Sequence, residues 1–104
     1  MKDFNDLKDD IRDEIRDAEK YIQKALARKE TNPGRAEVYR KLAEGELAHM
    51  EELHDEIVKE IKQWREETGQ EPPADMQAKY DLLHEIIMSD ANKVRLLIKL
   101  YKET

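Results

Sequence analysis

The sequence predicts an all-α fold in which one chain of 104 residues forms three helices in an up-down-up arrangement. Apolar residues recur every three or four positions along three long segments, which is the spacing of one helix face. None of these segments alternates with the period of two that a strand requires. Glycine and proline gather mainly at two places, and both places lie between the segments. The length fits a single helical domain over residues 1–104.

The two breaks set the expected ends of the helices. Residues 31–34 read Thr-Asn-Pro-Gly, which combines loop residues with a helix start. In the second break, Gly69 suits a helix C-cap, and the pair Pro72 and Pro73 prevents the helix from continuing. Because both connections are short, neighbouring helices should run antiparallel. The expected helices cover about residues 3–30, 33–68 and 73–103.

Charge and composition exclude several classes of function. The chain has 19 Lys and Arg against 25 Asp and Glu, so its net charge is −6. This acidic balance argues against a nucleic-acid partner. The longest apolar run, residues 96–98, is too short to span a membrane, and residues 1–4 lack an apolar signal region. We therefore expect no membrane partner and a cytoplasmic location. The absence of cysteine excludes disulfides and thiolate ligands.

Each apolar stripe is expected to face a shared core. The third segment has a surplus near its end, where Leu96, Ile98 and Leu100 cover more than one helix face. This surplus predicts a second contact surface, shared with another copy of the chain in a homo-oligomer. The alternative is a broad core face in a small bundle. The expected stripes are Phe4, Leu7, Ile11, Ala18, Tyr21 and Ala25, then Val38, Leu42, Leu53, Ile57, Ile61 and Trp64, then Met76, Tyr80, Leu83, Ile87, Val94, Leu97 and Tyr101.

Ligand-type residues interrupt these stripes at four positions. Glu14 lies in the middle of the first stripe, and Asp90 lies on the third. Glu46 and His49 lie on the second, and their i, i+3 spacing places both side chains on one patch of the helix. Counted from the turns at about 1.5 Å per residue, all four fall within about one turn of the same level.

Inward-facing carboxylates require a counter-charge, because burying a lone carboxylate costs several kcal/mol or raises its pKa. A divalent cation supplies two positive charges, and a carboxylate and imidazole set suits iron, manganese or zinc. The four residues therefore predict a metal site. The alternative is that the carboxylates lie at the edge of the stripe, where they reach water or ordinary ion pairs.

The same residues resemble the ferritin-like and rubrerythrin superfamily over residues 4–65. In that family a metal-binding Glu is followed by a Tyr seven residues later and an Ala four residues after that, as in Glu14, Tyr21 and Ala25. Residues 42–49 read Leu-Ala-Glu-Gly-Glu-Leu-Ala-His, which is similar to the family's second-helix motif. The 32-residue separation of Glu14 and Glu46 is also similar to that of the family.

The resemblance implies an iron or manganese site, dinuclear in the family, in which two Glu and two Glu-x-x-His motifs project from four helices. Glu46 would bridge the metals, with His49 and Glu14 as terminal ligands. Such sites oxidise or sequester iron or handle peroxide. This chain carries half of the set, so a second copy would complete it; alternatively, Asp90 completes a smaller site within one chain. A third reading is a degenerate relative without metal.

Two classes of function therefore stay open, and the sequence leaves undecided whether the protein is an enzyme. One is a ferritin-like metal-binding protein that works as a homo-oligomer. The other is a non-catalytic helical interaction or structural protein, such as a bacterial or phage accessory factor, in which the site is vestigial.

A second set of ligand-type residues comprises His54, Asp81 and His84. Asp81 and His84 repeat the i, i+3 spacing of acid and histidine, and the helix levels bring His54 and His84 near one another. A second cluster of metal ligands is one interpretation. Hydrogen-bonded imidazoles at the edge of the interior are the other, and the favoured one.

Overall fold

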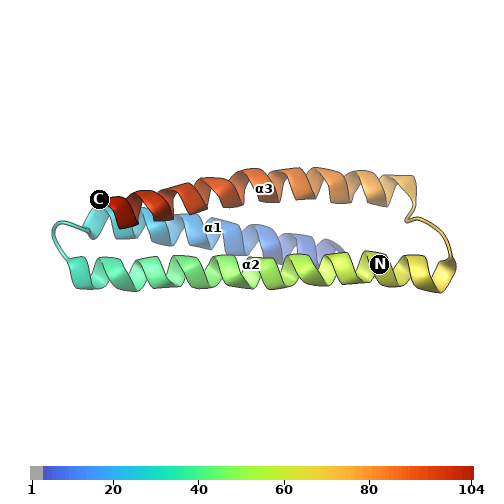
Figure 1. The fold of residues 1–104 in the computed structure, drawn as a ribbon, viewed down its shortest axis with the longest axis horizontal. Coiled ribbons are helices and arrows are strands. Elements are labelled where there is room, and N and C mark those ends of the chain that lie inside the picture. The colour runs from blue at the N-terminus through green and yellow to red at the C-terminus, as the bar shows by residue number, and fades with distance from the viewer. Residues whose placement is uncertain (1–3) are drawn as a thin grey trace.

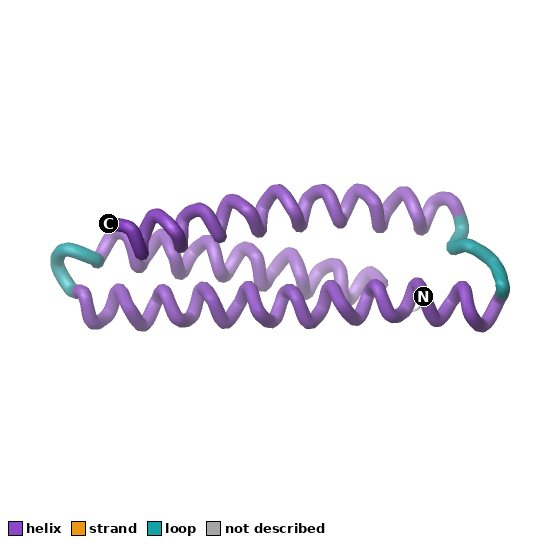
Figure 2. Tube along the Cα trace, in the orientation of Figure 1, coloured by secondary structure: helices purple, strands orange, loops and turns teal. Residues whose placement is uncertain are grey.

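The computed structural model describes residues 4–104, which form three α-helices joined by two short loops at opposite ends of the molecule (Figures 1 and 2). The helices are α1 (Phe4–Arg28), α2 (Pro33–Thr68) and α3 (Ala74–Glu103), and no strand occurs in this part of the chain. The all-α, up-down-up prediction is confirmed. The predicted start near residue 3 falls outside the described residues, and α1 ends slightly earlier than predicted.

Local chemistry at the two breaks explains where α2 begins and ends. The Asn32 side chain accepts a hydrogen bond of 3.2 Å from the backbone N–H of Arg35, and Pro33 occupies the first turn, where its missing N–H costs nothing. At the other end, Gly69 adopts a φ of 65°, a left-handed conformation that glycine takes without strain. Its N–H donates to the carbonyl oxygen of Arg65 at 2.9 Å.

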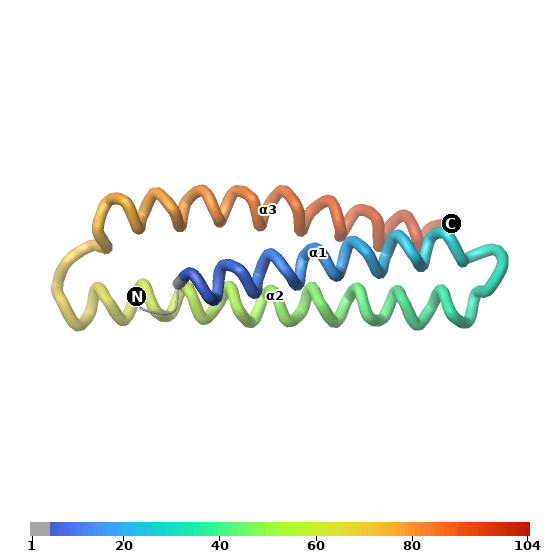
Figure 3. The backbone as a smooth tube through the Cα atoms, turned by 180° about the vertical axis from the view of Figure 1, so that it is seen from behind, coloured from blue at the N-terminus to red at the C-terminus, as the bar shows by residue number. Residues whose placement is uncertain are grey.

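The helices form a rod of 57 × 18 × 18 Å. Seen from behind, α1 runs between α2 and α3 (Figure 3), and it packs against both. Helices α2 and α3 contact each other much less than either contacts α1. Because α1 has 25 residues and α2 has 36, the end of α2 and the start of α3 extend beyond the start of α1.

One hydrophobic core runs along this rod and is lined by all three helices. Alanines contribute to it in every helix, and such small side chains let helix backbones approach closely. The buried apolar residues are Ile11, Ile15, Ala18, Ile22 and Ala25 of α1, Ala36, Ala43, Leu47, Met50, Ile57 and Ile61 of α2, and Leu83, Ile87, Ala91, Val94, Ile98 and Tyr101 of α3.

The register of the core differs from the predicted stripes in two helices. Val38 and Leu42 were expected in the core but are 56% and 42% exposed, while Ala43 is fully buried. In α3 the buried residue between Ile87 and Val94 is Ala91, and Asp90 is exposed. The prediction that Asp90 lies on the inward-facing stripe is therefore wrong.

The C-terminal end of α3 is fixed against the α1–α2 loop region. The Tyr101 hydroxyl donates to Glu37 of α2 at 3.2 Å, and burial raises the pKa of Tyr101, with the bond to Glu37 adding to the shift. Lys29 donates to the carbonyl oxygen of Tyr101, and its ammonium lies 4.5 Å from the centre of the Tyr101 ring. These contacts hold α3 close to the start of α2.

The apolar surplus predicted for α3 is exposed in this chain. Leu96 is 66% exposed and Leu100 is 48% exposed, whereas Ile98 is buried. None of the three helices, over residues 4–104, carries an apolar stretch long enough to cross a bilayer.

Candidate metal centre

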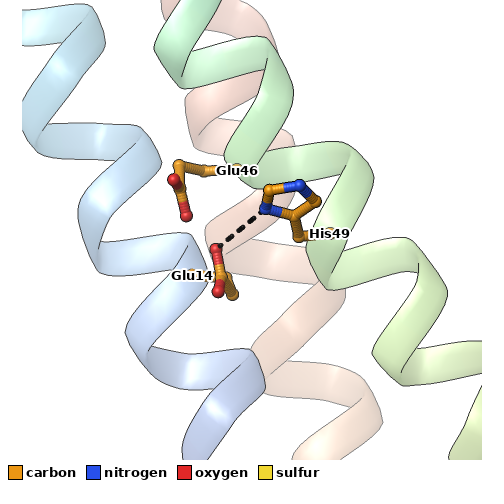
Figure 4. A group of neighbouring side chains, drawn as sticks. All are labelled: Glu14, Glu46 and His49. Atoms are coloured by element: carbon orange, nitrogen blue, oxygen red, sulfur yellow. Dashed lines mark ion pairs between the residues drawn. The ribbon is translucent and has the colours of Figure 1, made fainter.

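Glu14 of α1 and Glu46 and His49 of α2 lie together and point toward one another (Figure 4). One ligand atom from each of the three lies within 4.8 Å of the others. Nδ1 of His49 is 3.7 Å from Oε2 of Glu14. Within residues 4–104, no other group of three His, Asp or Glu side chains reaches this proximity.

The α1–α2 hairpin brings these residues together. Glu46 and His49 are three residues apart on α2, so both project from one face of that helix. Glu14 lies about as far before the first loop as His49 lies after it, and the two helices are antiparallel. Glu14, Glu46 and His49 therefore lie at the same height along the bundle, as the residue count from the first loop predicts.

Burial at the cluster is uneven. The Glu14 side chain is 27% exposed, and its Oε2 is buried without a hydrogen-bond partner among the described residues. The His49 side chain is 60% exposed. A buried carboxylate oxygen without a donor is costly, and a cation would satisfy it. Two carboxylates and an imidazole are a donor set for iron, manganese or zinc, so the residues present fit such an ion.

The cluster lies on the side of the hairpin that faces away from α3 (Figure 4). His49 faces Glu14 of α1, whereas Glu51, two residues later, is bound to Arg95 of α3 at 2.9 Å. Side chains two positions apart on a helix point in directions that differ by about 200°. The carboxylates thus lie at the rim of the α1–α2 interface, and the expectation that they face inward between three helices is wrong.

Asp90 does not belong to this group. It is exposed on α3, where its charge contributes to a raised pKa of Lys93, after the dominant hydrogen bond of Lys93 to Glu19 of α1. The alternative in which Asp90 completes a site within one chain is therefore wrong, and the first set reduces to Glu14, Glu46 and His49.

An open groove of about 530 Å³ begins at Glu14 and His49 and continues along α2. The acidic side chains Glu52 and Glu56 line it, three and seven residues after His49. Sequence reasoning did not single them out, although their helical spacing from His49 was the available signal. Lys59 also lines the groove and pairs with Glu56 at 3.2 Å, so Glu52 and Asp55 supply the excess of negative charge that favours the approach of a cation.

A pair of stacked tyrosines lies two helical turns from the cluster, toward the first loop. The rings of Tyr21 and Tyr39 have centroids 6.1 Å apart and an interplanar angle of 20°. Arg28 and Lys24 of α1 lie over the Tyr39 ring at 5.3 and 5.4 Å. Tyr21 was identified from the sequence, but Tyr39 was not. The signal for Tyr39 is its position seven residues before Glu46, which mirrors Tyr21 seven residues after Glu14.

Of the second predicted set, the structure brings His54 and His84 together but not Asp81. Nδ1 of His84 and Nε2 of His54 lie 3.3 Å apart across the α2–α3 interface, which agrees with the expected pairing of imidazoles. Burial lowers the pKa of His54, and the nearby His84 lowers it further. Asp81 instead accepts a hydrogen bond of 2.9 Å from the Gln77 side chain and forms no three-residue group with the histidines.

Comparison of the chain with protein-family models, with curated proteins and with solved structures gives no match. The ferritin-like resemblance therefore rests on the motif residues.

Proposed function

We propose that this chain is a ferritin-like metal-binding protein whose carboxylate and imidazole site binds iron, or manganese or zinc, between two copies of the chain. The observation that carries the proposal is the convergence of Glu14, Glu46 and His49, with ligand atoms within 4.8 Å and a buried Glu14 oxygen that has no protein donor. An ordinary salt bridge between Glu14 and His49 would not account for the nearby carboxylate of Glu46.

The position of the cluster supports a second copy as the missing half of the site. One chain offers three donor residues on an open face, and an iron-type site in this superfamily takes four carboxylates and two histidines from four helices. A second α1–α2 hairpin packed on the same face would double the donor set and shield the exposed His49 imidazole from water. Packing the two hairpins in this way would give a four-helix core with the two α3 helices outside it.

Apolar residues beside the cluster support the same face as the interface. Leu42 lies four residues before Glu46, Val38 lies four before Leu42, and both are exposed. Leu53, four residues after His49, lines the groove next to it. Covering this stripe would remove apolar surface from water at about 25 cal/mol per Å².

The chemistry proposed for the site is iron oxidation with sequestration, or peroxide handling. A bound iron would supply one-electron redox chemistry and an open position for an oxidant. The residues of this chain bind and orient: Glu46 offers a second carboxylate beside the Glu14–His49 pair, and the acidic groove at Glu52 guides cations inward.

A helical interaction protein with a vestigial site is the second candidate function. The observation in its favour is the exposure of Leu96 and Leu100 on α3, a helix that contributes no residue to the cluster. A dimer that completes the metal site leaves these residues uncovered, so they suit a different contact.

An anaerobic calorimetric titration of the metal-free chain with Fe²⁺ tests the proposal. We expect Glu46→Gln and His49→Gln each to weaken binding at least tenfold, because each removes a ligand while conserving size. The matched control is Glu66→Gln, which makes the same change at an exposed acid of α2 that lies outside both the groove and the three-residue group. Equal affinity in all four proteins would contradict the proposal.

A further inference from the structure

His54 and His84 meet where α2 and α3 are otherwise poorly joined. Their facing ring nitrogens are 3.3 Å apart, and the ring centroids are 5.4 Å apart with an interplanar angle of 30°. The two residues come from different helices, so their separation is set by the tertiary fold. Both side chains are partly buried, at the edge of the interface.

The distance between the two nitrogens matches the bite of a small metal ion. Zinc binds imidazole nitrogen at about 2.0–2.1 Å in tetrahedral geometry, which places two ligating nitrogens about 3.3–3.4 Å apart. A hydrogen bond between neutral imidazoles accounts for the same separation with one N–H between the rings. Moving that proton to the far nitrogen of its own ring leaves lone pairs on both facing nitrogens, with no net loss of protons.

The surroundings hold the two rings in place and favour a cation. Tyr80 stacks on His84 with centroids 6.0 Å apart, which restricts the rotation of that imidazole. A groove of about 210 Å³ next to His54 gives water and ions access to the ring. Glu51 and Arg95 in its lining are paired with each other, and Asp55 supplies the remaining negative charge. In zinc sites that are not closed by protein, water completes the coordination shell.

We propose that His54 and His84 form a second metal site, which takes Zn²⁺ or a similar nitrogen-preferring divalent ion and links α2 to α3. The site is separate from the Glu14, Glu46 and His49 group, because His49 and His54 point about 140° apart around α2. The first group also offers harder oxygen donors. The other polar links between these two helices are the hydrogen bond of Tyr101 to Glu37 and exposed pairs such as Arg95 with Glu51. Exposed pairs contribute little, so a metal shared by the two helices would add a link at a level where their polar contacts are weak.

Titration of the metal-free full chain with ZnCl₂, carried out in the His49→Gln background, tests this site alone. We expect Zn²⁺ to raise the melting temperature and to bind at one site per chain. Adding His84→Gln or His54→Gln should weaken that binding at least tenfold. Glutamine can still donate or accept a hydrogen bond, so a purely hydrogen-bonded pair predicts no Zn²⁺ effect to lose. Adding Glu85→Gln, an exposed acid next to His84, is the matched control.

A measurement on the unmodified chain guards against variants that fail to fold. In proton NMR, Zn²⁺ should shift the ring resonances of His54 and His84 together. The proposal is overturned if Zn²⁺ leaves both sets of resonances in place, or if it moves only those of His49. The outcome does not depend on iron binding at the first site, because that site contributes neither imidazole.

Discussion

Nδ1 of His49 lies 3.7 Å from Oε2 of Glu14, and that oxygen is buried without a hydrogen-bond partner in the part of the chain that the structure describes. This separation is longer than a hydrogen bond, which is about 2.7–3.2 Å for nitrogen and oxygen. Two ligand atoms on one metal ion, each at about 2.0–2.2 Å, are separated by about 3.3–3.6 Å in tetrahedral geometry. The two side chains therefore face each other at a distance that a small movement would adapt to a shared cation.

Replacing Glu14 with leucine should stabilise the metal-free protein. The substitution removes a half-buried carboxylate whose Oε2 lacks a donor, and it adds apolar area next to Ile11 and Ala18. We expect Glu14→Leu to raise the free energy of unfolding by about 1 kcal/mol in urea denaturation with a chelator present.

Glu19→Leu is the matched control for that gain. Glu19 lies on the same helix with a similar exposed fraction, but it is paired with Lys93 of α3 at 2.7 Å. Its replacement adds apolar area and loses the ion pair, so no net gain is expected. A loss of stability in Glu14→Leu would mean that its carboxylate is satisfied, and the argument for a missing cation would fail.

The register of α3 predicts opposite results at neighbouring positions. Ala91 is fully buried, so Ala91→Asp should lower the free energy of unfolding by at least about 2 kcal/mol, because it places a charge in the core. Asp90 is exposed, so Asp90→Ala should change stability by less than about 0.5 kcal/mol and leave metal affinity unchanged. Chemical denaturation and an Fe²⁺ titration measure both effects. Loss of metal binding in Asp90→Ala would instead support the alternative in which Asp90 completes a metal site within one chain.

The face proposed for self-association can be tested with two lysine substitutions. Leu42 lies one helical turn before Glu46 of the candidate site and Leu96 lies on α3, and both are exposed. If the dimer forms through the cluster face, Leu42→Lys should convert it to a monomer, because a charge would be buried in the interface. Leu96→Lys should leave the dimer intact. Light scattering measures the mass of each variant, and the reverse pattern would place the interface on α3.

The His54–His84 contact predicts that stability falls as the solution becomes mildly acidic. Burial, and then the neighbouring His84, lower the pKa of His54 below its usual value of 6.5, while Asp55 opposes the shift. Between the lowered and the usual value, the unfolded chain binds a proton that the folded chain does not. The contribution of His54 is therefore complete above pH 6.5 and is lost as the pH falls through its folded-state pKa.

The difference between the wild type and His54→Gln isolates this effect from the titration of carboxylates. We expect the stability gap between the two proteins to narrow or reverse between pH 7 and pH 5 in chelator-treated samples. A gap that stays constant over this interval would show that His54 titrates alike in the folded and unfolded chain.

The fold was predictable from the sequence because helix stops are local. Asn32, Pro33 and Gly69 act within one turn of their own positions, so the helix ends follow from them directly. The pairing of antiparallel helices then followed from the short connections. Counting residues from the first loop was enough to bring Glu14 level with His49.

The side of each helix that faces the core was less predictable. Spacings of three and four residues are both helical, so periodicity could not choose between Asp90 and Ala91. Alanine carries little weight in a hydrophobic pattern, yet Ala43 and Ala91 are fully buried where helices pack closely. The larger apolar residues Val38 and Leu42 have helical spacing, so the predicted stripe included them, although both lie on the exposed face of α2.

The metal content of the purified protein, measured together with its mass in solution, tests the central claim most directly. The chain, prepared anaerobically with Fe²⁺ and passed through a sizing column, should elute at no less than twice the mass of one chain with iron in the same fraction. Glu46→Gln should remain folded and elute without iron. A folded, iron-free wild-type monomer whose melting temperature does not respond to Fe²⁺, Mn²⁺ or Zn²⁺ would contradict the account.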